Sequence, residues 1–282
     1  MHQNPKCTNC EAEKKDGCDD KNCPDELLLK ENDDSIIRNV VAVMSGKGGV
    51  GKSSVTSLLA SSFNKKGYRV GILDADITGP SIPKMFGVTG MARNNGFAIM
   101  PSVTSTGIKV MSLNLLVPNE DDVVIWRGPI IAGAVKQFWT DVAWGEIDYL
   151  FVDLPPGTGD VPLTVMQSLP LNGLVVVSSP QELTAMIVRK AIKMALHMNI
   201  PVRGLVENMA GVVCPHCGER FPLFGPGRGK ETSEKFEIPF LGSIPVDPQL
   251  AMLCDRGRVE EYDFNPFVDL DPVIFEKNTV IV

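Results

Sequence analysis

The chain has 282 residues, of which 44% are hydrophobic and 22% are charged. This length and composition suit one large α/β core with appendages, and they exclude a wholly disordered, collagenous or fibrous protein. The chain has 27 basic and 34 acidic residues, a net charge of −7, which disfavours nucleic acid and anionic membranes as partners.

The sequence lacks two kinds of apolar segment that would direct it to a membrane or out of the cell. No run of about 18 apolar residues appears, so the sequence predicts no transmembrane helix. The first residues lack the apolar stretch of a secretory signal. We therefore expect a cytoplasmic protein whose seven cysteines are reduced and serve as metal ligands or redox groups rather than as a disulfide framework.

The N-terminal segment, residues 1–36, is acidic and nearly free of large apolar side chains, which predicts a mobile tail unless a metal orders it. It contains four of the seven cysteines, at Cys7, Cys10, Cys18 and Cys23. Four thiols in seventeen residues suffice for a metal cluster, but their spacing does not define its type. Unligated thiols are the alternative.

Residues 37–282 are predicted to form one domain, because short apolar runs alternate there with segments of helical period. This pattern is typical of an α/β fold with a mostly parallel sheet and helices on both faces. The clearest helices are expected at Lys52–Lys66 and Leu183–His197. The expected strands are Val40–Met44, Val70–Leu73, Lys109–Ser112, Val123–Trp126, Tyr149–Asp153, Gly173–Ser178, Val202–Asn208 and Phe240–Ile244.

A phosphate-binding loop follows the first expected strand, where residues 46–53 match G-x-x-x-x-G-K-[ST] and lead into a helix. Its glycines let backbone N–H groups turn toward one polyphosphate, and the helix adds its positive N-terminus. We expect Lys52 to reach the β- and γ-phosphates and Ser53 to bind Mg²⁺. The predicted nucleotide-binding residues here are Gly46, Lys47, Gly48, Gly49, Val50, Gly51, Lys52, Ser53 and Ser54.

A second lysine, Lys47, lies inside this loop. An ordinary phosphate loop does not need it. A cation at this position can neutralise charge on the transferred phosphoryl group, in its own subunit or in a partner subunit, as an arginine finger does. A solvated loop lysine is the alternative interpretation.

Acidic residues end two other expected strands. Asp153 closes an apolar strand in the Walker-B pattern, which holds Mg²⁺ through water. Asp74 and Asp76 follow another strand, and one of them can orient the attacking water. Gly157 is expected to offer its N–H to the γ-phosphate. A helix cap is the alternative role for an aspartate at a strand end.

A Cys-x-x-Cys pair, Cys214 and Cys217, precedes a glycine in the body of the chain. Such a turn lets two thiolates bind one metal or one edge of a cluster. Since four ligands are usual, His216, Cys254 and the tail complete the site, or a second copy of the chain brings its own pair. A structural zinc site remains an alternative, whereas the sequence context disfavours a thioredoxin-like redox motif.

Over about residues 36–260 the chain resembles the Mrp/ApbC family of iron–sulfur carrier P-loop ATPases, within the wider MinD and ParA-like group. The resemblance rests on the deviant Walker A loop Lys47–Ser53 and on three further segments, Asp74–Ser81, Asp153–Asp160 and Glu207–Met209 with Cys214–Gly218. The tail departs from the four-cysteine pattern of eukaryotic cytosolic members.

The resemblance implies an ATP-hydrolysing homodimer with catalytic residues Lys47, Lys52 and Asp76. Asn208 would contact adenine, and the loop with Pro245 and Asp247 would cover the other side of the base. Cys214 and Cys217, with their symmetry mates, would hold a bridging [4Fe-4S] cluster destined for apo-proteins. The alternatives are a MinD/ParA-like positioning ATPase and an ATPase whose cysteines hold structural zinc.

Overall fold

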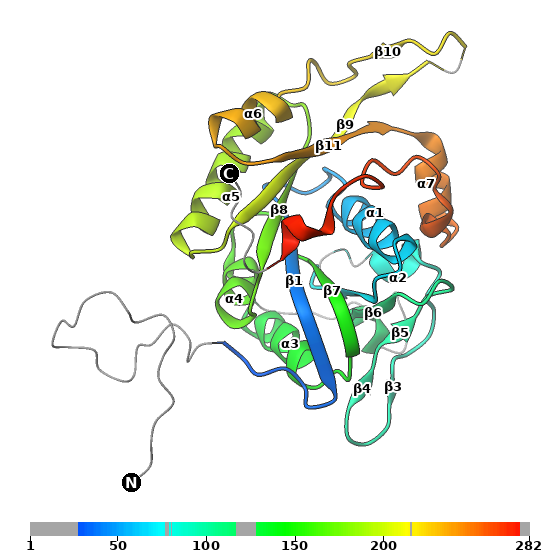
Figure 1. Ribbon diagram of the computed structural model, residues 1–282, viewed down its shortest axis with the longest axis vertical. Helices are drawn as coiled ribbons and strands as arrows, with labels where there is room; N and C mark the ends of the chain where they lie inside the picture. Colours follow the sequence, from blue (N-terminus) through cyan, green and yellow to red (C-terminus); the bar gives the residue numbers. More distant parts are fainter. Residues whose placement is uncertain (1–27, 77–78, 80, 117–127, 215, 277–282) are drawn as a thin grey trace, which may run out of the picture.

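The computed structural model describes residues 28–76, 79, 81–116, 128–214 and 216–276. Within these residues the main sheet runs in the order β10-β9-β8-β1-β7-β2-β6-β5, and β11 pairs with β9 (Figure 1). The strands are β1 Ser35–Ser45, β2 Val70–Asp74, β5 Ser102–Val103, β6 Lys109–Ser112, β7 Gly145–Asp153, β8 Gly173–Ser178, β9 Val202–Val213, β10 Arg220–Phe221 and β11 Phe240–Val246. A separate two-stranded sheet joins β3 Arg93–Asn94 to β4 Ile99–Met100.

The sheet is mostly parallel, as the sequence predicts. Only β10 on β9 and β5 on β6 pair antiparallel within it. Because parallel strands end at the same edge, the carboxyl ends of β1, β2, β7 and β8 come together there. That edge carries the loops that the sequence predicts to be functional.

Helices cover both faces of the sheet, so each face has its own apolar core. On one face pack α3 Gly128–Thr140, α4 Asp160–Ser168 and α5 Glu182–His197. On the other face pack α1 Lys52–Lys65, α2 Ile82–Met85 and α7 Pro248–Asp255, with Phe63 of α1 edge-on to Tyr149 and Phe151 of β7. Burial on both faces explains why the central strands are continuously apolar.

The predicted elements are found with small differences at their ends, except the expected strand Val123–Trp126, which lies outside the described residues. The largest differences are in β9, which ends at Val213 instead of Asn208, and in β1, which begins at Ser35 instead of Val40. The extra residues of β1 pair in register with Gly145–Tyr149 of β7. Only two of these five residues, Ile36 and Ile37, are apolar, and backbone pairing at the start of a strand leaves no mark in hydrophobicity.

Residues 28–34 lie against the body of the protein. The Leu29 N–H donates to the Ser168 carbonyl at 2.9 Å, and the Trp139 indole donates to the Leu29 carbonyl at 3.0 Å. The Asn32 amide donates to the Thr140 carbonyl at 3.0 Å. The division of the chain into a tail and one ATPase domain stays a prediction, and Cys7, Cys10, Cys18 and Cys23 lie outside the described residues.

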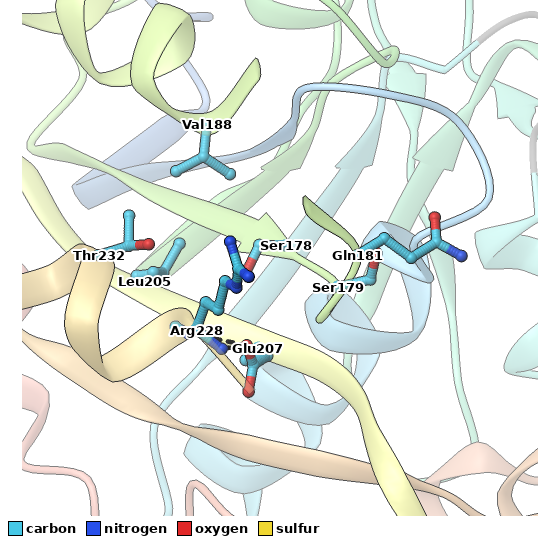
Figure 2. A pocket seen from close by; sticks show the side chains of 9 residues that line it. Ser178, Ser179, Gln181, Val188, Leu205, Glu207, Arg228 and Thr232 are labelled. Carbon is cyan, nitrogen blue, oxygen red and sulfur yellow. Dashed lines mark hydrogen bonds between the residues drawn. The ribbon is translucent and has the colours of Figure 1, made fainter. Parts of the chain in front are cut away.

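The short helix α6, Gly229–Lys235, is fixed to β9 through a buried carboxylate. Glu207 accepts the backbone N–H groups of Arg228 at 2.8 Å and of Gly229 at 2.7 Å, at the start of α6. These residues border a small pocket between β8, β9, α5 and α6 (Figure 2). The contact holds β9 in place at Glu207, which pairs with Ser178, the last residue of β8.

Beyond this anchor, β9 continues past the end of β8 and turns back as β10. Figure 1 shows this hairpin extending from the body at the end of the molecule where α6 lies. Arg220 pairs with Val213 and Phe221 with Val212. The hairpin therefore presents Cys214 and residues 216–219 at its tip. Among the described residues, no helix has the length and apolar character needed to span a membrane.

Candidate nucleotide and cysteine sites

The phosphate loop connects β1 to α1 at the carboxyl edge of the sheet. Gly49 and Gly51 have φ values of 79° and 75°, a left-handed conformation that glycine adopts without the steric cost of a Cβ. Gly51 directly precedes Lys52, the first residue of α1. The predicted strand, loop and helix are therefore all present, and the amino end of α1 faces the loop.

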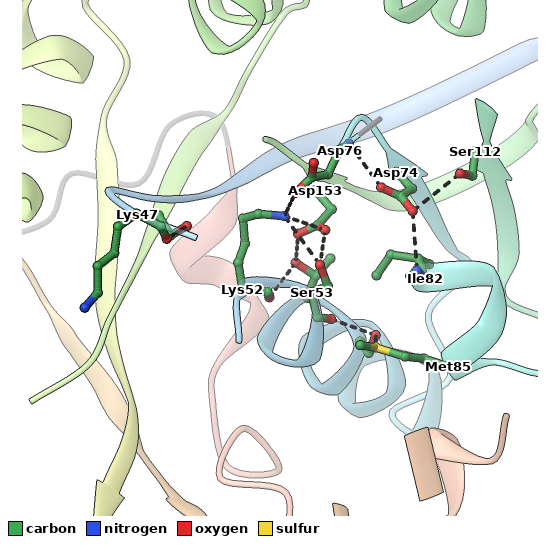
Figure 3. Close-up of polar contacts among 12 residues, drawn as sticks. Lys47, Lys52, Ser53, Asp74, Asp76, Ile82, Met85, Ser112 and Asp153 are labelled. Carbon is green, nitrogen blue, oxygen red and sulfur yellow. Dashed lines mark hydrogen bonds and ion pairs between the residues drawn. The ribbon is translucent and has the colours of Figure 1, made fainter. Parts of the chain in front are cut away.

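Asp153, at the end of β7, is the centre of the polar contacts behind this loop (Figure 3). One of its carboxylate oxygens accepts from the Lys52 ammonium at 2.7 Å and from the Ser53 hydroxyl at 2.6 Å. The other accepts from Thr56 at 2.7 Å. Asp153 is fully buried, so its charge requires these partners. The structure thus brings together the lysine, hydroxyl and carboxylate that the sequence assigns to phosphate and Mg²⁺.

Asp74 and Asp76 join this group from β2. Asp74 ends that strand directly opposite Asp153 of β7, and the Asp76 carboxylate lies 3.5 Å from the Lys52 ammonium. Asp74 accepts the N–H of Asp76 at 3.1 Å and that of Ile82 at 3.3 Å, so it also fixes the turn that follows β2. The two acidic strand ends predicted from sequence are therefore neighbours, and only one lysine lies among their three carboxylates in the described part of the site.

The pKa of Asp74 is raised to about 8, first because the carboxyl is buried and second because Asp153 is close. A carboxyl whose pKa is higher in the folded state than its ordinary value of 3.8 contributes stability that is present at low pH. That contribution is lost as the pH rises through about 8.

We therefore expect the unfolding free energy of the wild type to fall, relative to Asp74→Asn, between pH 5 and pH 8. Asparagine mimics the protonated carboxyl but does not titrate, so the unfolding free energy of the variant lacks the pH dependence that Asp74 causes. Any other effect of the amide on the unfolding free energy is the same at every pH. Urea unfolding midpoints at pH 5, 6, 7 and 8 measure it. Parallel curves for the two proteins would contradict the raised pKa.

The second lysine of the loop, Lys47, is not part of the Asp153 cluster. Figure 3 shows its side chain turned away from Lys52 and Asp153. Its ammonium donates to the side-chain oxygen of Gln181, which precedes α5. The Ser45 hydroxyl bonds the Lys47 carbonyl at 3.0 Å and fixes the backbone of this residue. The predicted role of Lys47 on its own nucleotide would therefore require it to leave Gln181.

Asn208 of β9 touches the loop from the opposite side. Its amide group donates to the Val50 carbonyl at 2.9 Å. The same nitrogen would lie 2.1 Å from a Cβ placed on Gly51, so glycine is required there by a side chain as well as by its φ. The predicted contact of Asn208 with adenine stays a prediction, but its position beside the loop is compatible with it.

Three further predicted residues have structural partners here. The N–H of Gly157, predicted to bind the γ-phosphate, donates to the Ser45 carbonyl at 2.8 Å. Asp247 caps α7 by accepting the Gln249 N–H at 2.8 Å, and it also accepts the Tyr262 hydroxyl at 2.7 Å. Pro245 lies in β11. The Gly157 N–H would therefore have to release the Ser45 carbonyl before binding a phosphate, whereas the predicted roles of Pro245 and Asp247 toward nucleotide are additional to their roles in the fold.

The Cys pair closes the tip of the β9–β10 hairpin. The Gly218 N–H donates to the Cys214 carbonyl at 2.9 Å, and Gly218 has a φ of 74°. The pKa of Cys214 is lowered by backbone N–H groups of Cys217 and His216, aimed at its sulfur, and by the Cys217 thiol. N–H groups directed at one sulfur favour the thiolate, the form that binds metals.

Other ligands for this pair are not found in the same place. Within the residues that the structure describes, no three His, Cys, Asp or Glu side chains are grouped as metal ligands. Cys254, a residue of α7, faces the core, and burial raises its thiol pKa to about 11. Of the ligand sources considered from sequence, the tail and a second copy of the chain remain.

Sequence reasoning missed two residues of the nucleotide site. Thr56 lies one helical turn after Lys52, where its hydroxyl faces the same carboxylate, and this spacing was a usable signal. Gln181, the partner of Lys47, left no comparable signal, because only the order of β8 next to β1 brings it to the loop.

The fold and this site together define a P-loop NTPase of the MinD/ParA-like type. Residues 36–268 match the family model described as ParA, NUBPL iron-transfer P-loop NTPase. The chain belongs to this family.

Two curated relatives are named iron–sulfur cluster carrier proteins. That of Methanocaldococcus jannaschii is 47% identical over 252 residues, which cover 86% of this chain and 87% of the relative. That of Clostridium perfringens is 44% identical over 267 residues, which cover 91% and 93%. The predicted resemblance to a family of iron–sulfur carrier P-loop ATPases is thereby confirmed.

Solved structures agree with this assignment. A nucleotide-binding protein from Archaeoglobus fulgidus, solved in complex with ADP and with cobalt found in it, is 50% identical with a TM-score of 0.76, over 85% of this chain and 95% of that one. The septum site-determining protein MinD from Pyrococcus horikoshii is 18% identical with a TM-score of 0.54, over 79% and 86%. This second likeness concerns the fold alone.

Proposed function

We propose that this protein is a cytoplasmic, ATP-hydrolysing carrier of iron–sulfur clusters. Two copies hold a [4Fe-4S] cluster between their Cys214–Cys217 pairs and transfer it to apo-proteins. The observation that carries the proposal is the placement of the Cys pair, in a thiolate-favouring turn at the tip of a strand whose other part contacts the phosphate loop. The names of the relatives support the same cargo.

The nucleotide site has suitable groups for ATP with Mg²⁺. Ser53 and Asp153 offer hydroxyl and carboxylate oxygens, which Mg²⁺ prefers, and Asp153 already holds a cation in the form of the Lys52 ammonium. When bound, Mg²⁺ would neutralise part of the negative charge of the phosphates. Ser53 would then be its direct ligand, and Asp153 would hold it through water.

The chain's own residues then have distinct roles. Lys52 binds the β- and γ-phosphates after exchanging Asp153 for them, and the N–H groups of residues 46–54 surround the phosphates. Asp76, 3.5 Å from Lys52, orients the attacking water. Lys47 leaves Gln181 to neutralise the charge that develops on the transferred phosphoryl group. Hydrolysis is slow and is coupled to loading or release of the cluster.

A second copy of the chain supplies the missing ligands. One pair gives two thiolates, and a two-fold axis through the cluster gives four. The surface around the pair suits such a contact, because four apolar side chains of the hairpin and its continuation are 39–48% exposed, namely Val213, Phe221, Leu223 and Phe224. Exposed apolar side chains on one hairpin and its continuation favour burial against a partner.

Reconstitution with iron and sulfide without oxygen tests the proposal. We expect about one [4Fe-4S] cluster per dimer when the four tail cysteines are replaced by alanine, so that only the body site is measured. Adding Cys214→Ala or Cys217→Ala should abolish iron and sulfide uptake, because two thiolates from each copy are required. Cys254→Ala is the matched control, because its thiol is buried in the core.

The outcomes separate the candidates. Uptake that persists in Cys214→Ala and Cys217→Ala would refute the carrier site. The same thiolate turn also suits zinc, which is the second candidate. If protein isolated without oxygen contained zinc bound to the Cys214–Cys217 pair and no iron or sulfide, the structural zinc site would be favoured over the carrier.

A further inference from the structure

A single strand connects the phosphate loop to the Cys pair. β9 spans 12 residues, from Val202 to Val213, and Cys214 follows it directly. Asn208, in the middle of the strand, donates to the Val50 carbonyl inside the loop. Five residues therefore separate the contact with the nucleotide loop from the first thiol. Any coupling between the two sites through β9 depends on how firmly each part of this strand is held.

The part of β9 up to Asn208 is held firmly. It pairs with β8 as far as Glu207 and with β11 as far as Asn208. The Glu207 carboxylate is buried and bonds the start of α6 through two N–H groups, one of which is shown in Figure 2. The Asn208 amide fills the space beside Gly51. When the phosphate loop shifts, the part of β9 up to Asn208 can therefore move little.

Directly beyond Asn208 the regular pairing is interrupted. Asn208 pairs with Ile244 and Val212 pairs with Val246, so three residues of β9, Met209–Gly211, lie opposite the single residue Pro245 of β11. Met209 has a φ of 59°, a left-handed conformation that side chains larger than asparagine rarely adopt. Such a bulge bends a strand and re-aims the residues beyond it.

The far side of the bulge belongs to the hairpin. Gly211 has a φ of 114°, and a Cβ on it would lie 2.7 Å from the Phe221 carbonyl, so β10 packs directly against it. From Val212 onward β9 pairs with β10, and the two strands carry the Cys turn between them. The hairpin is thus attached to the nucleotide domain through the bulge and through its return strand.

We propose that Met209–Gly211 is a joint that couples occupancy of the phosphate loop to the placement of Cys214 and Cys217, with Asn208 as the positioning residue. A nucleotide draws the loop N–H groups toward phosphate and competes for the Asn208 amide, so the hydrogen bond to Val50 is made or broken with binding. Because β9 is fixed at Glu207, the change is passed to the bulge, where the strained φ of Met209 makes a second backbone arrangement accessible. This coupling rests on the proposed function in one respect only, namely that Cys214 and Cys217 are the site of the cargo.

Thiol reactivity tests the joint without any cluster. The full-length protein is reduced without oxygen and alkylated with iodoacetamide, alone, with Mg·ADP or with Mg·AMP-PNP, and the modification of Cys214 and Cys217 is followed by peptide mass spectrometry. We expect nucleotide to change their alkylation rates by about fivefold or more, the lower range of ordinary coupling between sites. In Met209→Gly, which frees the joint, the change should fall below about twofold while Mg·ADP still binds.

Glu237→Gly is the matched control, because Glu237 is another non-glycine residue with a positive φ, 53°, located outside β9. It should retain the full nucleotide effect. A wild type whose thiols ignore nucleotide, or a Met209→Gly protein that responds like the wild type, would overturn the joint.

Reciprocal binding on the wild type gives a second measurement that needs no variant. If nucleotide and metal are coupled, cobalt(II) bound to the Cys pair must shift the Mg·ADP affinity by the factor by which Mg·ADP shifts cobalt(II) affinity. An unchanged Mg·ADP affinity would count against the joint even if Met209→Gly did not fold. Because neither readout requires iron or sulfide, the joint can fail while cluster uptake succeeds, and the reverse.

Discussion

Replacing Lys52 by methionine is expected to weaken Mg·ATP binding on the order of a hundredfold and also to destabilise the fold by about 3–5 kcal/mol. The binding loss follows from removal of the charge that meets the phosphates. The stability loss follows from the structure, because Lys52 is 5% exposed and its ammonium lies 2.7 Å from the fully buried Asp153. Without it, Asp153 keeps only the Ser53 and Thr56 hydroxyls, and no described cation replaces the lysine.

The double variant Lys52→Met/Asp153→Asn separates the two effects. Removal of both charges should recover most of the stability, since an uncompensated buried charge costs more than a neutral pair. It should not recover nucleotide binding. Urea unfolding and equilibrium nucleotide titration measure the two quantities. If the single variant were as stable as the wild type, the ion pair would have no structural role, and if it bound Mg·ATP normally, Lys52 would not be the phosphate ligand.

Replacing Lys47 by alanine is expected to leave Mg·ATP binding nearly unchanged and to lower turnover on the order of 10³, the lower range for loss of a finger-type cation. Lys47 donates to Gln181 and contacts neither Lys52 nor Asp153, so its removal disturbs no buried charge. Thermal stability should therefore remain that of the wild type. Steady-state phosphate release and nucleotide titration measure the two sides of this prediction, and normal turnover would contradict it.

Mixing two inactive variants shows in which subunit Lys47 acts. In the proposed dimer, formed from one Lys47→Ala copy and one Asp76→Ala copy, one nucleotide site retains Asp76 and can receive Lys47 only from the other copy. If Lys47 acts across the dimer, mixing restores part of the turnover. If it acts on its own nucleotide, every site lacks one of the two groups and the mixture stays inactive. A Lys47→Ala protein mixed with itself is the baseline.

Much of the nucleotide site was predictable because its signals are local. The loop, its flanking strand and its helix are contiguous, and glycine spacing by itself predicts the turn that α1 then continues. Asp153 and Asp74 were recognised because each ends an apolar run, and parallel strands end at one edge. Thr56 also had a local signal, since it lies one helical turn after Lys52.

The remainder depends on contacts between segments that are distant in the chain. Asp74 becomes the neighbour of Asp153 because β2 pairs with β7, and its raised pKa follows from that pairing. Lys47 reaches Gln181 because β8 lies beside β1. The first residues of β1 were missed because pairing with β7, and not apolar character, makes them a strand.

The sequence by itself determined the class of protein, the nucleotide loop and the choice of Cys214 and Cys217 as candidate metal or cluster ligands. These features could be predicted because each follows from a short contiguous motif. Only the tertiary structure decided how the two sites are connected. The order of β8, β9 and β11 brings Asn208 to the loop and places Met209–Gly211 opposite Pro245. A bulge of this kind arises from the mismatch between two paired strands, so it exists only once both strands are in place.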